Sequence, residues 1–185
     1  MRDEETGSWW QQASGKAIFG PLKGESLELA PYDELTFGLW KQESPAGQVL
    51  APVGKDEKEY NSKWEDEIQK LPLVLAFPGT PLQSRDVVIG MEVAGASRAY
   101  PIKALIEQSP IQDRLGGTPI VLTVGPDGKS VRGFVSRLGG ADIEFFRKSA
   151  TAGPKQGKCL ERLPLLKDFW FDWRNYHPTT SVYRH

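Results

Sequence analysis

The chain has 185 residues, of which 39% are hydrophobic, enough for one ordinary domain or two small ones. Its 23 basic and 24 acidic residues nearly cancel, so it lacks the positive charge typical of nucleic-acid-binding proteins and polybasic membrane-binding segments. With a single cysteine and two separated histidines it can form no internal disulfide and shows no zinc-ligand spacing, and we expect neither a bound metal nor a cofactor.

The N-terminal segment places polar residues next to a pair of tryptophans. The acidic residues at positions 3–5 could act as paired carboxylates in acid–base chemistry, but an acidic cluster at a terminus is usually solvated. Ser8 has no histidine near it in the sequence, which leaves a nucleophilic triad unsupported. Trp9 and Trp10 cannot both face a core from one strand, so we expect one of them to be exposed, as a candidate for a binding surface.

Residues 20–50 align without a gap on residues 153–183, and nine of the 31 positions are identical. The shared residues are mainly glycine, proline and large apolar residues, which form turns and fill cores, so we interpret the repeat as two copies of one structural unit. Each copy predicts a short strand, with Leu27 and Leu29 on one face in the first copy, followed by a helix that ends before a proline.

The two predicted helices have different caps and one apolar face. Thr36 is the expected N-cap of the first helix and Asp168 that of the second. In the second copy an apolar stripe at helical spacing should face the core, and it comprises Leu166, Phe169, Trp170 and Trp173. Cys159, in the short strand of the second copy, is expected to be a small buried hydrophobic residue.

Residues 55–70 contain ten charged side chains in sixteen positions. Ser62 and Glu65 are spaced as a capping box, and apolar residues at positions 60, 64, 68 and 71 would line one helical face. We therefore predict a helical linker within residues 55–79.

From residue 86 onward the sequence pattern changes to that of strands. Residues 87–101 predict a hairpin around Gly95, residues 102–109 a short helix, and residues 118–137 a second hairpin. Residues 141–146 predict one more strand. The sequence thus predicts an α+β fold, mainly antiparallel β with short helices, in which two related units are joined by the helical linker.

Motifs spread over the chain are similar to those of one protein family. Near the N-terminus the pattern Thr-Gly-Ser-x-Trp-x-Gln-x-x-Gly-x-Ala-Ile-x-Gly-Pro runs from Thr6 to Pro21. Val-Ile-Gly followed by Arg-Ala-Tyr-Pro occupies residues 88–101, and IQDRLGGTPIVLTV and WRNYHPTTSVY occupy residues 111–124 and 173–183. In these motifs the chain resembles a bacterial family of domains of unknown function, DUF3179.

The order of the motifs carries an implication for domain organisation. In that family the Arg-Ala-Tyr-Pro segment precedes the Thr-Gly-Ser-x-Trp segment within one domain, whereas here it follows. The resemblance therefore implies a tandem, with the C-terminal part of a truncated first domain in residues 1–54, the linker in 55–79 and a second, shortened domain in 80–185. We expect the two units to pack on each other, because a half-domain would otherwise expose its core face.

A truncated first domain also has implications for the N-terminus and the cellular location of the protein. Met1 would be an internal methionine, and a missing N-terminal part could carry an export signal. As written, the chain predicts a soluble protein without a transmembrane segment, because its longest apolar run, residues 71–77, is too short to span a bilayer.

Members of the family often carry His-Glu, Asn-Asp and Cys-Pro-x-Cys groups that suit metal or thiol chemistry. Here the matching stretches read LIEQSPIQD and TVGPDGK, in which Asp113 remains while the histidine and both cysteines are absent. The resemblance therefore implies no metal or redox activity for residues 80–185.

Four residues are candidates for a site assembled in space. Arg98 and Tyr100 alternate along a strand and could point into one pocket, although a tyrosine packed at a strand end is the commoner structure. Asp113 is expected to make an Asx-type turn bond before two glycines. His177 occupies the position that Ser44 has in the first repeat copy, so it either stabilises the end of a helix or belongs to a site of the second unit.

Three functions remain open. The leading one is a non-catalytic structural or ligand-binding module, with Trp9 and Trp10 as binding candidates. The second is an enzyme whose site combines Arg98, Tyr100, Asp113 and His177. The third is a metal- or redox-linked extracytoplasmic protein whose ligands lie in a missing N-terminal part.

Overall fold

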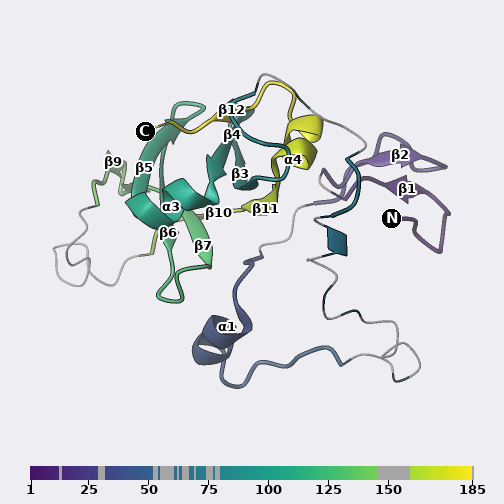
Figure 1. The fold of residues 1–185 in the computed structure, drawn as a ribbon, viewed down its shortest axis with the longest axis horizontal. Helices are drawn as coiled ribbons and strands as arrows, with labels where there is room; N and C mark the ends of the chain where they lie inside the picture. The colour runs from purple at the N-terminus through teal and green to yellow at the C-terminus, as the bar shows by residue number, and fades with distance from the viewer. Residues whose placement is uncertain are drawn as a thin grey trace.

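The computed structural model describes residues 1–12, 14–28, 32–51, 80–145 and 159–184, and positions 54, 61, 63, 67–68, 70–73 and 77 between them (Figure 1). These parts form a mixed α+β structure with mainly antiparallel strands and short helices, which confirms the α+β, mainly antiparallel part of the prediction. The predicted linker helix, including Ser62 and Glu65 of its capping box, lies largely outside the described residues.

The centre of the fold is a sheet with the strand order β11-β3-β4-β12. Strands β3 (Val87–Val93) and β4 (Ala96–Pro101) form the hairpin predicted around Gly95. β11 (Leu166–Phe169) pairs antiparallel with β3, and β12 (Ser181–Val182) pairs parallel with β4. The second repeat copy therefore supplies both edges of a sheet whose middle comes from residues 87–101.

A second sheet has the strand order β10-β7-β6-β5. β5 (Ile111–Leu115), β6 (Thr118–Val124) and β7 (Val131–Val135) are joined by hairpins, which confirms the hairpin predicted over residues 118–137. β10 (Arg162–Leu163) pairs with the outer side of β7. The helix predicted over residues 102–109 is α3 (Ile102–Gln108), and it connects the two sheets.

The alternation of side chains along β3 and β4 separates two buried cores. One face packs against α3 and the second sheet, and its buried residues include Ile89, Met91, Tyr100, Leu105, Ile120 and Leu122. The other face packs against α4 (Trp170–Tyr176) and buries Val88, Ala99, Trp170 and Trp173. The predicted core-facing stripe is thus confirmed for the two tryptophans, whereas Leu166 and Phe169 lie in β11.

Helices α1 (Phe37–Glu43) and α4 lie at the same positions of the two repeat copies and end in the same way. The backbone N–H of Ser44 donates to the Trp40 carbonyl at 2.8 Å, and that of His177 donates to the Trp173 carbonyl at 2.9 Å. Their starts differ. Thr36 caps α1 as predicted, with Oγ1 accepting from the Leu39 N–H at 3.3 Å.

The predicted N-cap of α4 is wrong. The helix begins after Phe169, and Asp168 pairs with Val88 as part of β11. The reason is that β11 runs directly into α4, so the residue before the helix belongs to the sheet and its cap position has no polar side chain.

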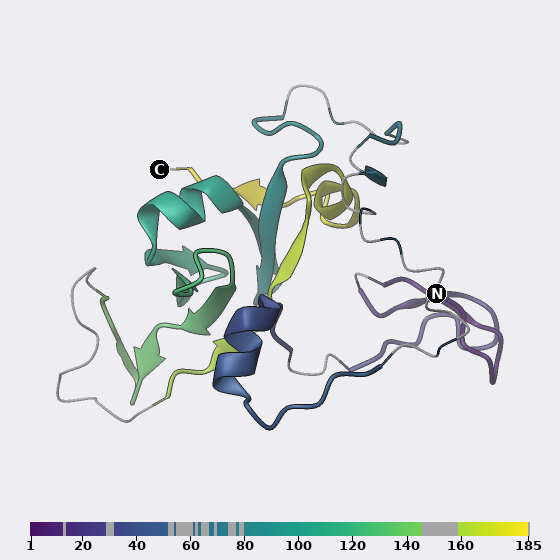
Figure 2. The ribbon, with the colours of Figure 1, turned by 60° about the horizontal axis from the view of Figure 1, so that its bottom comes forward.

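The N-terminal residues form a small lobe that projects from the body in Figures 1 and 2. In it β1 (Trp9–Trp10) pairs antiparallel with β2 (Ala17–Phe19). The strand predicted near Leu27 is wrong, because Ser26 makes only an isolated bridge to Lys16 and Leu27 is exposed; Leu29 lies outside the described residues.

Two further predictions concern the segment that follows the second sheet. The strand predicted over residues 141–146 is shorter, since β9 (Ala141–Asp142) pairs with β8 (Arg137–Leu138) and the next three residues are not in a strand. Cys159 is exposed rather than buried, because it lies before β10 instead of within a strand. None of the helices in the described part of the chain is long and apolar enough to cross a bilayer.

Candidate functional site

Three of the four residues proposed for an assembled site meet between the two sheets. Arg98 and Tyr100 point to the same side of β4, and Asp113 reaches them from β5. The Tyr100 hydroxyl donates to Asp113 Oδ2 at 2.8 Å, and the Arg98 guanidinium donates to the same oxygen. Arg98 Nε also donates to Ser181 Oγ at 2.9 Å, so the cluster joins β4, β5 and β12.

The cluster has the properties of a structural tie between the sheets. The Tyr100 side chain is fully buried, and its burial together with the bond to Asp113 raises the pKa of the phenol well above its usual range. A phenol that keeps its proton cannot act as a base at neutral pH. The Asx turn expected at Asp113 is wrong, because the residue lies within β5 and its Oδ2 accepts from Arg98 and Tyr100 of β4, in the other sheet.

His177 lies on the opposite face of the central sheet from this cluster. Its ring stacks on Trp173 with the ring centroids 3.7 Å apart, and Nδ1 lies 3.1 Å from the Trp173 carbonyl oxygen. Its Nε2 lies 3.5 Å from Glu92, which faces α4 because side chains alternate along β3. The structure therefore places β3 and β4 between His177 and the other three residues.

The polar residues of the N-terminal lobe bond to one another. The Trp10 indole N–H donates to Asp3 Oδ2 at 2.8 Å, and Thr6 donates to the same carboxylate through its backbone and its hydroxyl. These bonds, the indole first, lower the pKa of Asp3 to about 2. Ser8 is fully buried, with Oγ 2.7 Å from Thr6 Oγ1 and accepting from the Leu22 N–H, so it is a structural residue of this lobe.

The two tryptophans of the lobe differ as expected. Trp9 is 50% exposed, whereas Trp10 is buried at 9% and held by Asp3. Glu4 and Glu5 are exposed in a turn, which agrees with a solvated acidic cluster. Of the two tryptophans, Trp9 is therefore the exposed ring and Trp10 the structural one.

A groove that the sequence did not indicate lies along α1. Figure 2 shows this helix beside the strands of the second sheet. We call it the α1 groove, a hollow of about 790 Å³ whose lining includes Tyr32, Phe37, Trp40, Glu43, Arg132 and Arg162. A smaller cavity of about 280 Å³ adjoins it and shares Tyr32, Asp33, Leu35 and Arg132 with it. The aromatic side chains come from the first repeat copy, and the arginines come from β7 and β10.

Helix α1 is attached to the body at its N-terminus. Thr36 Oγ1 donates to Asp127 Oδ2 at 2.6 Å, and the Thr36 backbone N–H donates to Ser130 Oγ at 3.0 Å. Leu39 is buried, in contact distance of the turn at Gly125. The bonds from Ser130 and Thr36 hold the pKa of Asp127 well below its usual range, so this anchor carries a charge at neutral pH.

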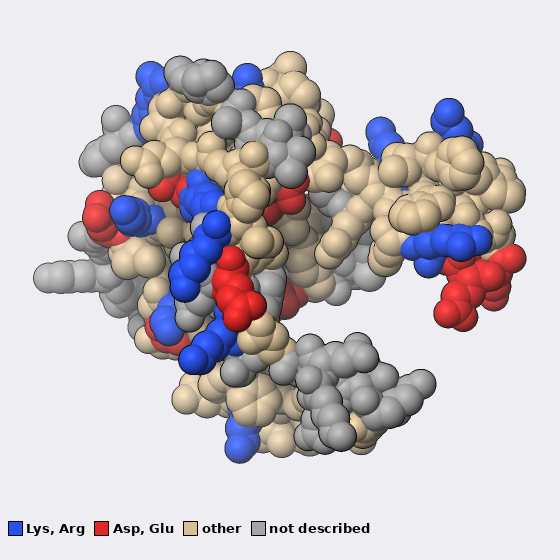
Figure 3. All heavy atoms as spheres, turned by 45° about the vertical axis from the view of Figure 1, so that its right-hand side comes forward, with Lys and Arg blue, Asp and Glu red and all other residues tan. Residues whose placement is uncertain are grey.

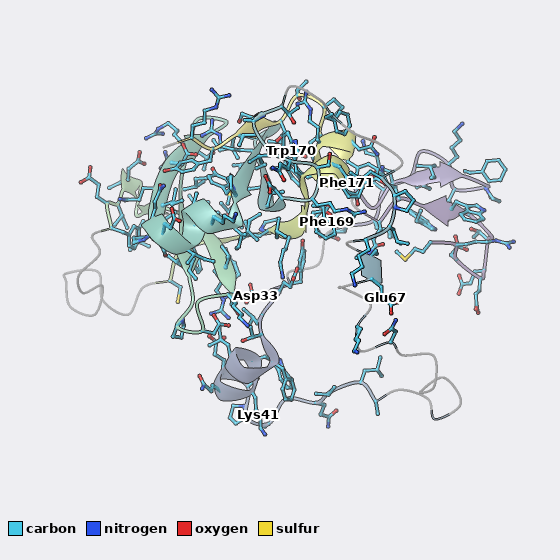
Figure 4. The ribbon with its side chains drawn as sticks, viewed as in Figure 1. Asp33, Lys41, Glu67, Phe169, Trp170 and Phe171 are labelled. Atoms are coloured by element: carbon cyan, nitrogen blue, oxygen red, sulfur yellow. The ribbon has the colours of Figure 1, made fainter. Side chains whose placement is uncertain are left out.

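Ion pairs fix the polar wall of the groove. Arg132 forms a bidentate salt bridge with Glu43, with N–O distances of 2.8 and 2.5 Å, and its Nε also donates to Asp33 Oδ2 at 3.2 Å. Arg162 donates to the same Asp33 oxygen at 2.6 Å. Figure 4 shows Asp33 between α1 and the strands of the second sheet. The bond from Arg132 lowers the pKa of Glu43, so the Glu43–Arg132 pair is charged at neutral pH.

Acidic and basic side chains also lie next to one another on the part of the body shown in Figure 3. In the α1 groove the lining holds two acidic side chains, Asp33 and Glu43, and two basic ones, Arg132 and Arg162. Among the residues that the structure describes, the charges of this wall therefore cancel, and the wall offers oriented hydrogen-bonding groups of both signs.

Sequence reasoning missed this groove for a physical reason. Asp33 and Glu43 bond to arginines that are 89 to 129 residues away in the chain, so no short motif contains both partners. The repeat is the one sequence signal for the aromatic side of the groove, because it aligns Phe37 and Trp40 with Trp170 and Trp173. The two copies differ in burial: Phe37 is 62% exposed, whereas only 1% of Trp170 is exposed.

One pair of carboxylates lies apart from these sites. Asp168, at the end of β11, is half-buried, and Asp172 follows it in the first turn of α4. Burial and the neighbouring charge of Asp172 raise the pKa of Asp168 to about 6, and burial raises the pKa of Asp172. Within the described parts of the chain, no three metal-binding side chains come together.

Comparisons with known proteins found one match. The family model described as "Protein of unknown function (DUF3179)" matches residues 1–180. No curated protein and no solved structure matches the chain.

Proposed function

The chain belongs to the DUF3179 family of proteins of unknown function, and we propose that it is a non-catalytic ligand-binding module whose site is the α1 groove. One observation carries the proposal. A hollow of about 790 Å³ places three partly exposed aromatic rings beside two sets of opposite charges that are already locked in position. Pockets for small ligands have volumes of this order and combine apolar walls with a few oriented polar groups.

The rings are held in place before any ligand arrives. The Tyr32 hydroxyl donates to the Leu165 carbonyl at 2.6 Å, which fixes the ring against the strand end. Phe37 and Trp40 stack with their centroids 5.6 Å apart, because residues three apart lie on one side of a helix. Side chains ordered in advance lose little conformational entropy on binding, which supports a recognition role.

An enzyme site at Arg98, Tyr100 and Asp113 is less well supported. The Asp113 carboxylate already accepts two bonds from these neighbours, and the phenol is buried. Such a cluster stabilises the fold without offering a reactive group to a substrate. His177 adds nothing to it, because the central sheet lies between them.

We also propose that the repeat reflects a tandem of related units, with residues 1–54 as the C-terminal part of the first and 80–185 as the second. The matching ends of α1 and α4 support this proposal. The contacts of Thr36, Asp33 and Glu43 with residues 127–162 support the packing of the first unit on the second.

The test of the proposed function uses the full chain, labelled with nitrogen-15, and a mixture of small ligands that covers sugars, short peptides, organic anions and planar aromatic compounds. We expect at least one class to shift the indole signal of Trp40, and Phe37→Ala to weaken the response about tenfold, which is about 1.4 kcal/mol.

Phe19→Ala is the matched control, because Phe19 is 67% exposed on the N-terminal lobe, close to the 62% of Phe37. This variant should respond as the wild type does. If no class of ligand shifts the Trp40 signal, or if both variants respond alike, the α1 groove is not a ligand site.

A further inference from the structure

We infer that the ligand of the α1 groove is a neutral, polyhydroxylated chain, that is, an uncharged oligosaccharide segment. The inference rests on the proposed function and specifies its ligand. It combines the charge balance of the groove, the type of its polar groups and the exposed aromatic faces.

Charge balance argues against an ionic ligand. Asp33 and Glu43 face Arg132 and Arg162, and every one of these groups already has a partner of opposite charge. A phosphate or carboxylate ligand that used the remaining N–H groups of these arginines would lie beside Asp33 and Glu43, and a cationic ligand would lie beside the arginines. Either ligand would be attracted by one member of each ion pair and repelled by the other, so the paired wall favours neither sign of charge.

The polar groups argue equally against a purely apolar ligand. An apolar surface pressed on these ion pairs would remove their water without returning hydrogen bonds, at a cost of about 1–3 kcal/mol for each group. A carboxylate has about four acceptor positions and a guanidinium has five N–H groups, so each keeps capacity after pairing. Hydroxyl groups both donate and accept, and they can use this capacity without breaking the pairs.

The exposed aromatic rings of the groove complement the apolar face of a sugar ring. The C–H groups on one face of a sugar ring carry partial positive charge and pack on the negative face of an aromatic ring. Phe37 is 62% and Tyr32 is 41% exposed, and both border the groove together with Trp40. A sugar ring thus finds an apolar platform on α1 and hydrogen-bonding partners on β7 and β10.

The shape of the site indicates a chain rather than a single sugar. The α1 groove and the adjoining cavity of about 280 Å³ meet at Tyr32, Asp33 and Arg132. The smaller cavity is also lined by Glu34, Lys129 and Lys167, and Lys167 Nζ lies 3.4 Å from Glu34 Oε1. Consecutive sugar units could occupy the two hollows, with the shared residues between them.

The test is isothermal titration calorimetry of the full chain with cellohexaose, maltohexaose and chitohexaose as neutral probes. A hexamer of galacturonic acid and a proline-rich decapeptide represent anionic and peptide ligands. We expect one neutral hexasaccharide to bind, and its affinity to change less than about twofold between 50 and 500 mM salt, because an uncharged ligand is not screened.

Two pairs of variants locate the binding. Phe37→Ala should weaken it about tenfold while Phe19→Ala leaves it unchanged. Arg162→Ala should weaken it about fivefold. Arg137→Ala is its control, because both arginines are about half-exposed and paired with an aspartate. Circular dichroism verifies that each variant is folded.

The outcomes separate the two proposals. Binding of the galacturonic acid hexamer or the peptide with sensitivity to Phe37→Ala, without binding of a neutral sugar, overturns the inference and leaves the proposed function standing. Neutral-sugar binding that both arginine variants or both phenylalanine variants affect alike places the sugar elsewhere and also overturns it. Absence of binding by all three neutral hexasaccharides overturns the inference whatever the broader ligand mixture shows.

Discussion

The indole ring of Trp173 lies directly on the backbone of Gly90. A β-carbon built on Gly90 would be 2.3 Å from two atoms of that ring, closer than any side chain can approach. The contact brings α4 onto the central sheet, where Gly90 pairs with Ala99 and both residues leave room for the indole. The close approach therefore depends on the absence of a side chain at position 90.

Gly90→Ala should lower the free energy of unfolding by about 3 kcal/mol, because Trp173 is buried and cannot move without repacking α4. Chemical denaturation monitored by circular dichroism measures this. Gly38→Ala is the control, since nothing lies near that position in α1, and it should stabilise the chain by up to about 1 kcal/mol. Equal effects of the two changes would contradict the packing of α4.

Asp113→Ala should cost about 2–3 kcal/mol, because it leaves the buried Tyr100 hydroxyl without its acceptor. Tyr100→Phe should cost about 1 kcal/mol, and the double variant should be more stable than the sum of the single effects predicts. Asp142→Ala breaks only exposed ion pairs and should change stability much less than either of these variants. Additive effects at Asp113 and Tyr100 would show that the two side chains are not coupled.

His177→Ser should keep the fold and cost about 1 kcal/mol, the loss of the stacking on Trp173. Ser44 ends α1 with nearly the same backbone geometry, φ −131° and ψ 67° against φ −124° and ψ 71° at His177. Trp173→Ala should cost about 3–5 kcal/mol in the same denaturation experiment. If His177→Ser is as destabilising as Trp173→Ala, the histidine has a structural role that serine cannot fill, although Ser44 fills the same position in α1.

Asp168→Asn should stabilise the protein at pH 7 and have no effect near pH 3. The pKa of Asp168 is raised to about 6 in the folded chain, so the folded state holds the proton more tightly and its stability falls as the pH rises through 6. The expected gain at pH 7 is about 1 kcal/mol, because partial exposure screens the group. Melting temperatures from pH 3 to pH 8 measure this.

Asp142→Asn is the control of opposite sign. The bonds from Arg137 and Arg114 lower the pKa of Asp142, so its contribution to stability is present at neutral pH and is lost as the pH falls through the lowered pKa. This variant should be less stable than the wild type at pH 7 and equal to it in strong acid. The interpretation of Asp168 is wrong if Asp168→Asn shows the same pH dependence of stability as Asp142→Asn.

Much of the local structure could be predicted from sequence. Thr36 followed by Leu39 and Trp40 marks a capped helix, and the turn residues between apolar strands mark both hairpins. The errors came where tertiary context decided a local feature. Asp168 looks like a cap, but pairing with Val88 places it in a strand, and Asp113 looks like a turn residue, but pairing with Ile120 places it within β5.

The candidate site was predicted only in part, because some of its contacts are local and others depend on the tertiary structure. Alternation along β4 puts Arg98 and Tyr100 on one side of the strand whatever the fold, so their meeting is a local property. The position of His177 is not local, because it depends on which face of the sheet receives α4. Gly90 and Ala99 on that face make room for Trp173, and His177 follows the helix there.

The sequence by itself determined the elements and the family, because periodicity, caps, turns and motifs act over a few residues. Only the tertiary structure decided which elements meet. It placed the second repeat copy at both edges of the central sheet, and it brought Asp33 and Glu43 against Arg132 and Arg162 to form the α1 groove. Such contacts join residues some hundred positions apart, and their free energy depends on burial and charge pairing that exist only once the chain is folded.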